Sequence, residues 1–121
     1  MTHVLLVEDD TLLAREQSRQ LETAGFSVQH VAHAGAALVA IDEQLPQVII
    51  VDMLLPVTSG LSLLHELQSY EDTATIPIVV CTSLADTLSL EELAPYGVRR
   101  LLDKTTMQPE DIVTAVRAVR L

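Results

Sequence analysis

Three carboxylates, one hydroxyl and one lysine stand where short apolar segments of this 121-residue chain end. Asp9 and Asp10 follow the first apolar run, and Asp52 follows four consecutive β-branched residues. Thr82 ends a later apolar run, and Lys104 comes shortly after the last one. Carboxylate oxygens bind hard divalent cations, while a hydroxyl and an ammonium can hold phosphoryl oxygens. If the fold gathers these side chains, they can support attack of an aspartate on phosphorus.

The elements that must position these side chains alternate strand and helix five times. Strands are expected at 3–7, 27–31, 48–52, 76–82 and 98–102. Helices are expected between 10 and Gly25, at about 34–44, at about 59–70, within 86–95, and from about Pro109 onward, the last burying Ile112, Val113, Val116 and Val119. Such alternation predicts an α/β fold with a parallel sheet and helices on both faces.

The strand order decides whether the carboxylates meet. The doubly wound order 2-1-3-4-5 uses five strands and has its switch point between the first and third strands. These are the two strands that end in Asp9–Asp10 and in Asp52. Two carboxylates about 5 Å apart repel by roughly 3 kcal/mol at an effective dielectric near 20, so a cation is expected there. Oxygen ligands favour Mg²⁺, with Mn²⁺ as a second possibility.

Two simpler interpretations of these acids stay open. Asp10 can serve only as the N-cap of the first helix, because aspartate accepts hydrogen bonds from the free N–H groups there. Glu8 can be only the last residue of the first strand, with its carboxylate in solvent.

Composition limits the class of protein. The length predicts one domain over 1–121, and the net charge of −10 argues against direct nucleic-acid binding. No apolar run is long enough for a membrane span or a signal peptide, so no membrane contact is expected. The single cysteine, Cys81, excludes an internal disulfide and fits the reducing cytoplasm. It precedes Thr82 and should face the other way, as a buried structural thiol; a redox sensor is the alternative.

The whole chain resembles the receiver domain of two-component response regulators. The resemblance rests on an acidic pair after the first strand, a phosphoacceptor in an Asp-x-x-x-Pro-x-x-x-Gly setting, a hydroxyl after the fourth strand and a lysine after the fifth. The matching residues are Asp9, Asp10, Asp52, Pro56, Gly60, Thr82 and Lys104.

The resemblance implies a function for each of these positions. Asp52 would accept a phosphoryl group from a histidine kinase or a histidine phosphotransfer protein. Asp10, Asp52 and the backbone carbonyl of Leu54 would bind Mg²⁺, with Asp9 acting mainly through water. Thr82 and Lys104 would hold the phosphoryl oxygens. The domain would catalyse only its own phosphorylation and dephosphorylation, and so would not be an enzyme in the usual sense.

The resemblance also implies an output surface, formed by the helix within 86–95, the strand 98–102 and the last helix. This surface would respond to phosphorylation and could contact an output domain, a partner protein or a second copy of the chain. Basic side chains gather here, either as a solvated face or as partners of acids such as Glu91 and Glu92. They are Arg99, Arg100, Arg117 and Arg120.

Two departures from the family pattern keep an alternative open. Leu101 stands where the family usually has an aromatic residue that moves on phosphorylation, and Thr105 stands where a proline usually follows the lysine through a cis bond. Because a cis bond before a non-proline residue costs about 3 kcal/mol, a trans bond or a strained loop is predicted after Lys104. The alternative function is an unphosphorylated pseudo-receiver that only docks. A phosphatase of the haloacid-dehalogenase type is disfavoured, because it needs a second aspartate where this chain has Leu54.

Overall fold

A five-stranded parallel sheet lies at the centre of the protein. The computed structural model describes residues 1–120. The strands are β1 (His3–Val7), β2 (Ser27–Val31), β3 (Val48–Val51), β4 (Ile78–Thr82) and β5 (Val98–Asp103), in the order β2-β1-β3-β4-β5. All neighbouring strands pair in parallel. The predicted α/β class and strand order 2-1-3-4-5 are confirmed.

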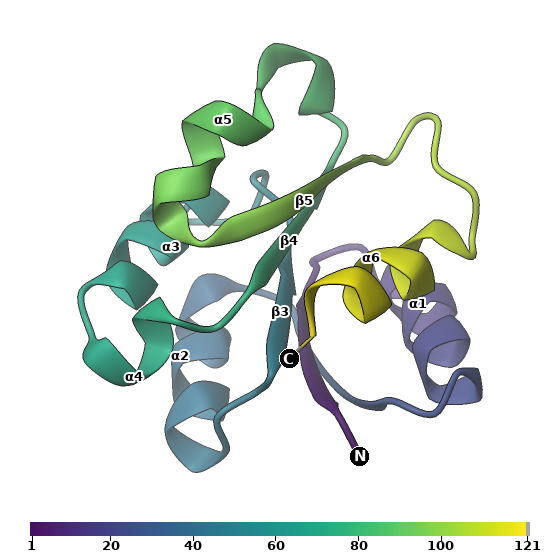
Figure 1. Cartoon of the computed structure of the whole chain (residues 1–121), viewed down its shortest axis with the longest axis horizontal. Helices are drawn as coiled ribbons and strands as arrows, with labels where there is room; N and C mark the ends of the chain where they lie inside the picture. The colour runs from purple at the N-terminus through teal and green to yellow at the C-terminus, as the bar shows by residue number, and fades with distance from the viewer. Residues whose placement is uncertain (121) are drawn as a thin grey trace.

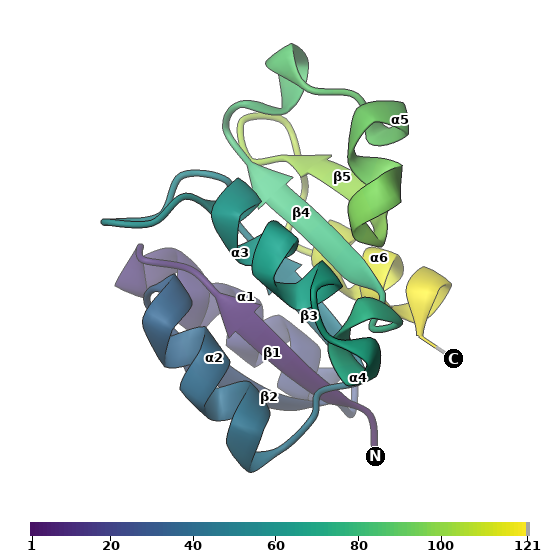
Figure 2. The same ribbon diagram turned by 90° about the vertical axis from the view of Figure 1, so that its left-hand side faces the viewer.

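Helices cover both faces of this sheet (Figures 1 and 2). One face carries α1 (Thr11–Thr23) and α6 (Asp111–Val119). The other carries α2 (Ala34–Glu43), α3 (Gly60–Gln68), α4 (Glu71–Ala74) and α5 (Leu90–Leu93), with the 3₁₀ turns η1 (Ala85–Thr87) and η2 (Ala94–Tyr96) beside α5. Within residues 1–120, no helix combines the length and apolar character that crossing a membrane requires.

The alternation of side chains along the strands divides the core into two clusters, one on each face. Leu5, Ile49 and Val80 belong to the cluster beneath α2, α3 and α5. Leu6 and Ile50 belong to the cluster beneath α1 and α6. The three inner strands are buried on both faces, which explains their continuous apolar sequences.

Side-chain caps fix the starts of four helices. The Asp10 carboxylate accepts from the N–H of Leu13 at 3.1 Å, and the Ser89 hydroxyl accepts from the N–H of Glu92 at 3.1 Å. His33 and Ser59 cap α2 and α3 in the same way. Capping satisfies N–H groups that have no partner within the helix, so these residues determine where each helix begins.

The largest differences from the predicted boundaries concern one strand and three helices. The strand predicted at 76–82 begins at Ile78, and the helix predicted at about 59–70 ends at Gln68 and is followed by the separate short helix α4. The helix predicted within 86–95 consists of η1, α5 and η2, and Ser89 is the N-cap of α5. The last helix begins at Asp111 instead of near Pro109.

Candidate functional site

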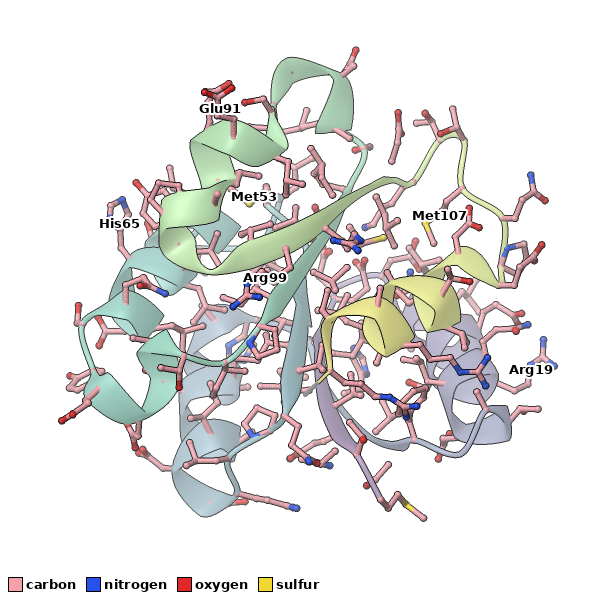
Figure 3. The ribbon with its side chains drawn as sticks, in the orientation of Figure 1. Arg19, Met53, His65, Glu91, Arg99 and Met107 are labelled. Carbon is pink, nitrogen blue, oxygen red and sulfur yellow. The ribbon has the colours of Figure 1, made fainter. Side chains whose placement is uncertain are left out.

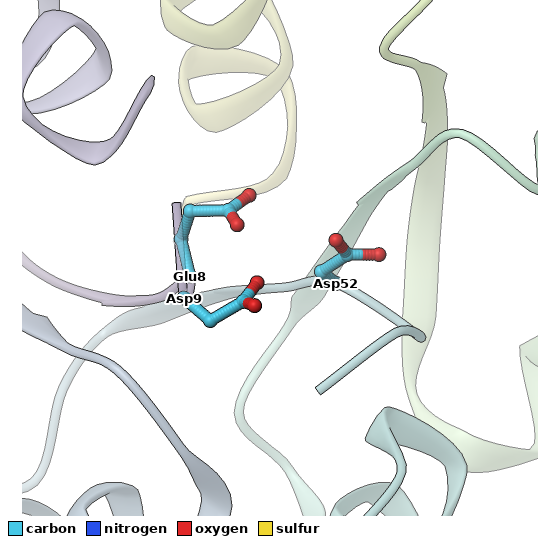
Figure 4. A group of neighbouring side chains, drawn as sticks. All are labelled: Glu8, Asp9 and Asp52. Atoms are coloured by element: carbon cyan, nitrogen blue, oxygen red, sulfur yellow. The ribbon is translucent and has the colours of Figure 1, made fainter. Parts of the chain in front are cut away.

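Three carboxylates converge where β1 and β3 end. Glu8 and Asp9 directly follow β1, and Asp52 directly follows β3. The last residues of these strands, Val7 and Val51, are register partners, so the two strand ends lie side by side. One carboxylate oxygen from each residue lies within 4.8 Å of the other two (Figure 4). Parallel neighbouring strands present their carboxyl ends at one edge of the sheet, so these acids meet although they are distant in sequence.

Asp52 is buried and held by two donors. Its residue exposure is 4%, far lower than that of a typical aspartate. One carboxylate oxygen, Oδ1, accepts from the N–H of Leu54 at 3.0 Å. The other, Oδ2, accepts from Nζ of Lys104 at 2.6 Å. The carboxylate therefore has a fixed orientation at the edge of the sheet.

Lys104 joins β5 to the acidic cluster. Its Nζ lies 2.6 Å from Oδ2 of Asp52 and 2.5 Å from Oε1 of Glu8. Burial alone lowers the pKa of Lys104, but its hydrogen bonds to Asp52 and Glu8 outweigh burial and raise that pKa. Burial raises the pKa of Glu8, and the hydrogen bond from Lys104 opposes this shift. Lys104 therefore stays a cation at neutral pH and bridges the two strand ends.

Asp10 lies outside this carboxylate cluster. It is exposed, and its side chain caps α1. The structure therefore places the acidic pair at Glu8 and Asp9, one residue earlier than the predicted pair Asp9–Asp10. The predicted N-cap contact of Asp10 is confirmed. The solvated placement considered for Glu8 is wrong, because only 2% of this residue is exposed.

A signal for Glu8 was present in the sequence. Side chains two apart in a strand point to the same face, so Glu8 continues the inward-facing series of Val4 and Leu6. An acidic residue in such a series must be paired, because an isolated buried charge is costly. Lys104 is the partner, and it directly follows β5, a strand that is not adjacent to β1.

Thr82 lies at the same edge of the sheet, at the end of β4. It is fully buried, and its hydroxyl oxygen accepts from the N–H of Leu84 at 3.3 Å. Its backbone carbonyl accepts from the N–H of Lys104 at 3.1 Å. β4 is the neighbour of both β3 and β5, so the hydroxyl-bearing residue stands between Asp52 and Lys104 in the strand order.

The backbone of Gly60 packs closely against the backbone of Asp52 and Met53. A Cβ atom on Gly60 would lie 2.2 Å from the carbonyl oxygen of Asp52 and 2.7 Å from the Cα of Met53. The N–H of Gly60 also donates to the carbonyl of Met53 at 3.0 Å. Only glycine fits here without displacing the backbone that carries Asp52.

The two departures from the family pattern have clear structural outcomes. None of the peptide bonds within residues 1–120 is cis, so the predicted trans bond after Lys104 is confirmed. Leu101 is partly buried and packs on the core cluster beneath α2, α3 and α5. The loop after Lys104 is therefore built without the constraint that a proline ring gives.

The carboxylate cluster fits a hard divalent cation. Glu8, Asp9 and Asp52 offer oxygen ligands only, and such sets favour Mg²⁺ or Mn²⁺. Lys104 supplies one positive charge against three carboxylates, which leaves the group acidic. Asp9 is exposed, so an ion can reach the cluster from solvent.

Comparisons with known proteins agree with this geometry. The profile of the response regulator receiver domain matches residues 4–117. The DNA-binding dual master transcriptional regulator RpaA of Synechocystis is 31% identical over 98% of this chain and 49% of its own length. The transcriptional regulatory protein CseB of Streptomyces coelicolor is 28% identical over 98% of this chain and 49% of its own length. The chain thus spans about half the length of these curated relatives.

Solved structures show the same fold. A sensor protein from Polaromonas superposes with a TM-score of 0.86 at 30% identity, covering 97% of this chain and 94% of that one. The chemotaxis response regulator CheY4 of Vibrio cholerae superposes with a TM-score of 0.88 at 25% identity, covering 98% of both chains.

A doubly wound sheet with an acidic cluster and a lysine at its carboxyl edge defines the class of receiver-like α/β domains. Within this class, the chain belongs to the receiver domain family of two-component response regulators.

Proposed function

We propose that the domain is a phosphorylation-controlled signalling module in which Asp52 accepts the phosphoryl group. The observation that carries this proposal is the setting of the Asp52 carboxylate. It is buried, oriented by Leu54 N–H and Lys104 Nζ, and placed beside two further carboxylates at the edge of the sheet. A purely structural aspartate needs no such acidic neighbours.

The phosphodonor in this proposal is a phosphohistidine of a histidine kinase or a phosphotransfer protein. An Asp52 oxygen forms the new O–P bond as the P–N bond to the donor imidazole breaks. The electron pair stays on the imidazole nitrogen, which then takes up a proton. Lys104 exchanges its contact with Asp52 for a phosphoryl oxygen, and the Thr82 hydroxyl donates to a second one.

Asp9, Asp52 and the backbone carbonyl of Leu54 are the proposed ligands of Mg²⁺, with Mn²⁺ as a substitute. Glu8 acts beside them through Lys104 and through water. When bound, such a cation neutralises the negative charge that an anionic donor meets at this cluster. Asp10 is not in this proposed set, because its side chain caps α1 and lies outside the group of three carboxylates.

The proposed output surface comprises α5, β5 and α6. Arg99 and Arg100 on β5 are exposed, and so is Glu91 on α5, which lies apart from Arg99 in Figure 3. A partner protein, an output domain or a second copy of this chain would bind there after the loops around Thr82 and Lys104 move. With a net charge of −10, direct nucleic-acid binding by this domain is not expected. A cytoplasmic location also stays a prediction.

Intact mass after incubation with acetyl phosphate tests this function. We expect the mass of one added phosphoryl group on the wild type with Mg²⁺, and none without Mg²⁺ or in Asp52→Ala. Asp42→Ala removes an exposed aspartate of α2 and should accept the group as the wild type does.

The same experiment separates the active receiver from the pseudo-receiver alternative. If the wild type stays unmodified and Mg²⁺ with beryllofluoride does not stabilise it, the docking function replaces the phosphoacceptor function. Leu101, which packs into the core without an aromatic ring, is the observation that keeps this alternative worth testing.

A further inference from the structure

The segment that carries Lys104 has little support from regular structure. β5 is an edge strand whose neighbour in the sheet is β4, and residues 104–110 form no helix or strand before α6. The backbone N–H of Lys104 donates to the carbonyl of Thr82 at 3.1 Å, which is its last bond to the sheet. The position of the lysine backbone therefore depends on the turn that follows.

Asp103 closes this turn with both its side chain and its backbone. Its Oδ1 accepts from the N–H of Thr105 at 2.8 Å and from the hydroxyl of Thr105 at 2.6 Å. Its carbonyl accepts from the N–H groups of Thr106 at 3.2 Å and Met107 at 2.9 Å. Three residues after Lys104 are thus tied back to the residue directly before it.

We infer that Asp103 is a positioning residue for Lys104: its carboxylate, by binding Thr105 in a turn with a trans bond, fixes the lysine backbone so that the ammonium reaches Asp52. This inference rests on the proposed function and deepens it, because it assigns the control of Lys104 to a residue that does not touch the phosphoryl group.

The physical reason lies in the flexibility of lysine. Four methylene groups separate its backbone from its ammonium, so the ammonium can change partners only within the reach that its Cα position allows. In the proposed function, the ammonium of Lys104 must move from Glu8 and Asp52 to a phosphoryl oxygen while its Cα atom stays in position. A turn anchored on both sides of Lys104 permits this exchange, whereas a free loop would not.

The chemistry of the turn agrees with this role. Thr105 lacks the ring that would restrict its backbone, and it contributes two donors that proline could not supply. The hydrogen bonds from the hydroxyl and the N–H of Thr105 lower the pKa of Asp103. Asp103 therefore stays ionised and remains a strong acceptor across the neutral range.

Met107 connects the far end of this turn to the core. Cys81 donates from its thiol to the thioether of Met107 at 3.5 Å, and Met107 lies on the loop between β5 and α6 (Figure 3). The turn is thus held at Thr82, at Asp103 and at Cys81. Of these three restraints, the Asp103 side chain is the one that can be removed without touching the core.

The same loop offers a matched control. Oδ2 of Asp111 accepts from the N–H of Gln108 at 2.8 Å, which is a carboxylate–backbone bond of the same type and length as that of Asp103. Asp111 stands at the start of α6, beyond the residues next to Lys104. Asp111→Ala therefore removes an equivalent bond without releasing the turn.

Separate measurements of Mg²⁺ and beryllofluoride affinity test the inference. Because the hydrogen bonds of the ionised Asp103 carboxylate hold the turn, we expect Asp103→Ala to weaken beryllofluoride binding at saturating Mg²⁺ by about tenfold. Its Mg²⁺ affinity should stay near that of the wild type. Asp103→Asn keeps an acceptor oxygen and should recover most of the loss, and Asp111→Ala should bind beryllofluoride normally.

A second readout needs no phosphoryl analogue. The backbone N–H of Lys104 donates to the carbonyl of Thr82, and its hydrogen exchange can be followed by NMR. Asp103→Ala should speed this exchange, and Asp111→Ala should not.

The two readouts distinguish the failure of the inference from the failure of the function. Unchanged hydrogen exchange of the Lys104 N–H in Asp103→Ala, or equal losses of Mg²⁺ and beryllofluoride affinity, would overturn the role of Asp103. A wild type that binds neither probe overturns the proposed function instead, and the hydrogen exchange of Lys104 then still decides the role of Asp103.

Discussion

Lys104 and its acidic partners show how single residues acquire properties that their neighbours in sequence lack. Glu8, Asp9 and Asp10 are consecutive acids, yet they are a buried ion-pair partner, an exposed member of the carboxylate cluster and a helix cap. Sequence patterns located Asp9, Asp52, Thr82 and Lys104 at strand ends. The cluster contains Glu8 in place of Asp10, and the sequence patterns did not single out Glu8, because the contact that identifies it comes from Lys104, far along the chain.

Substitution of Asp9 and Asp10 by alanine, one at a time, separates these roles. Asp10→Ala should lower the free energy of unfolding by about 1 kcal/mol, the usual value of an N-cap, and leave Mg²⁺ affinity unchanged. Asp9→Ala should leave the free energy of unfolding without Mg²⁺ nearly unchanged and reduce Mg²⁺ affinity by at least tenfold. Urea unfolding and Mg²⁺ titration of both variants measure this, and a loss of Mg²⁺ affinity in Asp10→Ala alone would restore the pair predicted from the sequence.

Cys81 is expected to be chemically inert in the folded protein. It is 2% exposed, and burial raises the pKa of its thiol to about 11. The thiolate, which is the reactive form, is then about a thousandth of the thiol at pH 8. Iodoacetamide should therefore label the wild type at pH 8 only in denaturant, as intact mass can show. Rapid labelling of the native domain would favour the redox-sensor alternative.

At the scale of elements, the sheet and its strand order followed from the sequence, whereas the helices after β3 did so only in part. The spacing of Leu61, Leu64 and Leu67 predicted one helix to about residue 70. The structure ends α3 at Gln68, where the hydroxyl of Thr73 donates to the carbonyl of Leu67 at 2.5 Å. Bonds of this kind between a side chain and a backbone group several residues away leave no periodic signal, so α4 could not be foreseen.

Two glycines at helix starts should respond in opposite ways to alanine. Gly60→Ala places a Cβ against the backbone of Asp52 and Met53, and should destabilise the domain by about 2 kcal/mol or more and slow phosphorylation. Gly35 lies in α2, where an added Cβ meets the His33 ring no closer than 3.4 Å. Gly35→Ala should be neutral or stabilise by about 0.5 kcal/mol. Thermal unfolding of both variants measures this difference in stability. Equal stability changes in the two variants would mean that the close approach of Gly60 to Asp52 does not matter.

The whole molecule is strongly acidic, and binding of a cation to it should raise its free energy of unfolding. The net charge is −10, and three carboxylates meet at one edge of the sheet. Any ligand that binds only the folded state adds RT ln(1 + [L]/Kd) to the free energy of unfolding. The same edge also meets the donor in the proposed reaction, so metal binding and phosphoryl transfer should be linked.

Mg²⁺ should therefore stabilise the domain by about 2.7 kcal/mol at a concentration one hundred times its Kd. Thermal unfolding with MgCl₂ should be compared with NaCl at equal ionic strength, because salt alone screens the repulsion in an acidic protein. Asp52→Ala should show the NaCl response in both salts. An equal rise in Tm with the two salts would mean that the carboxylate cluster does not select a divalent cation.

The division of the core by the sheet has a consequence for how this chain can vary. Core residues beneath α1 and α6 and core residues beneath α2, α3 and α5 form two separate clusters. Effects of substitutions at such separated sites usually add to within about 0.5 kcal/mol. Each face can thus accumulate changes without regard to the other, and epistasis should concentrate at the carboxyl edge, where Glu8, Asp52 and Lys104 depend on one another.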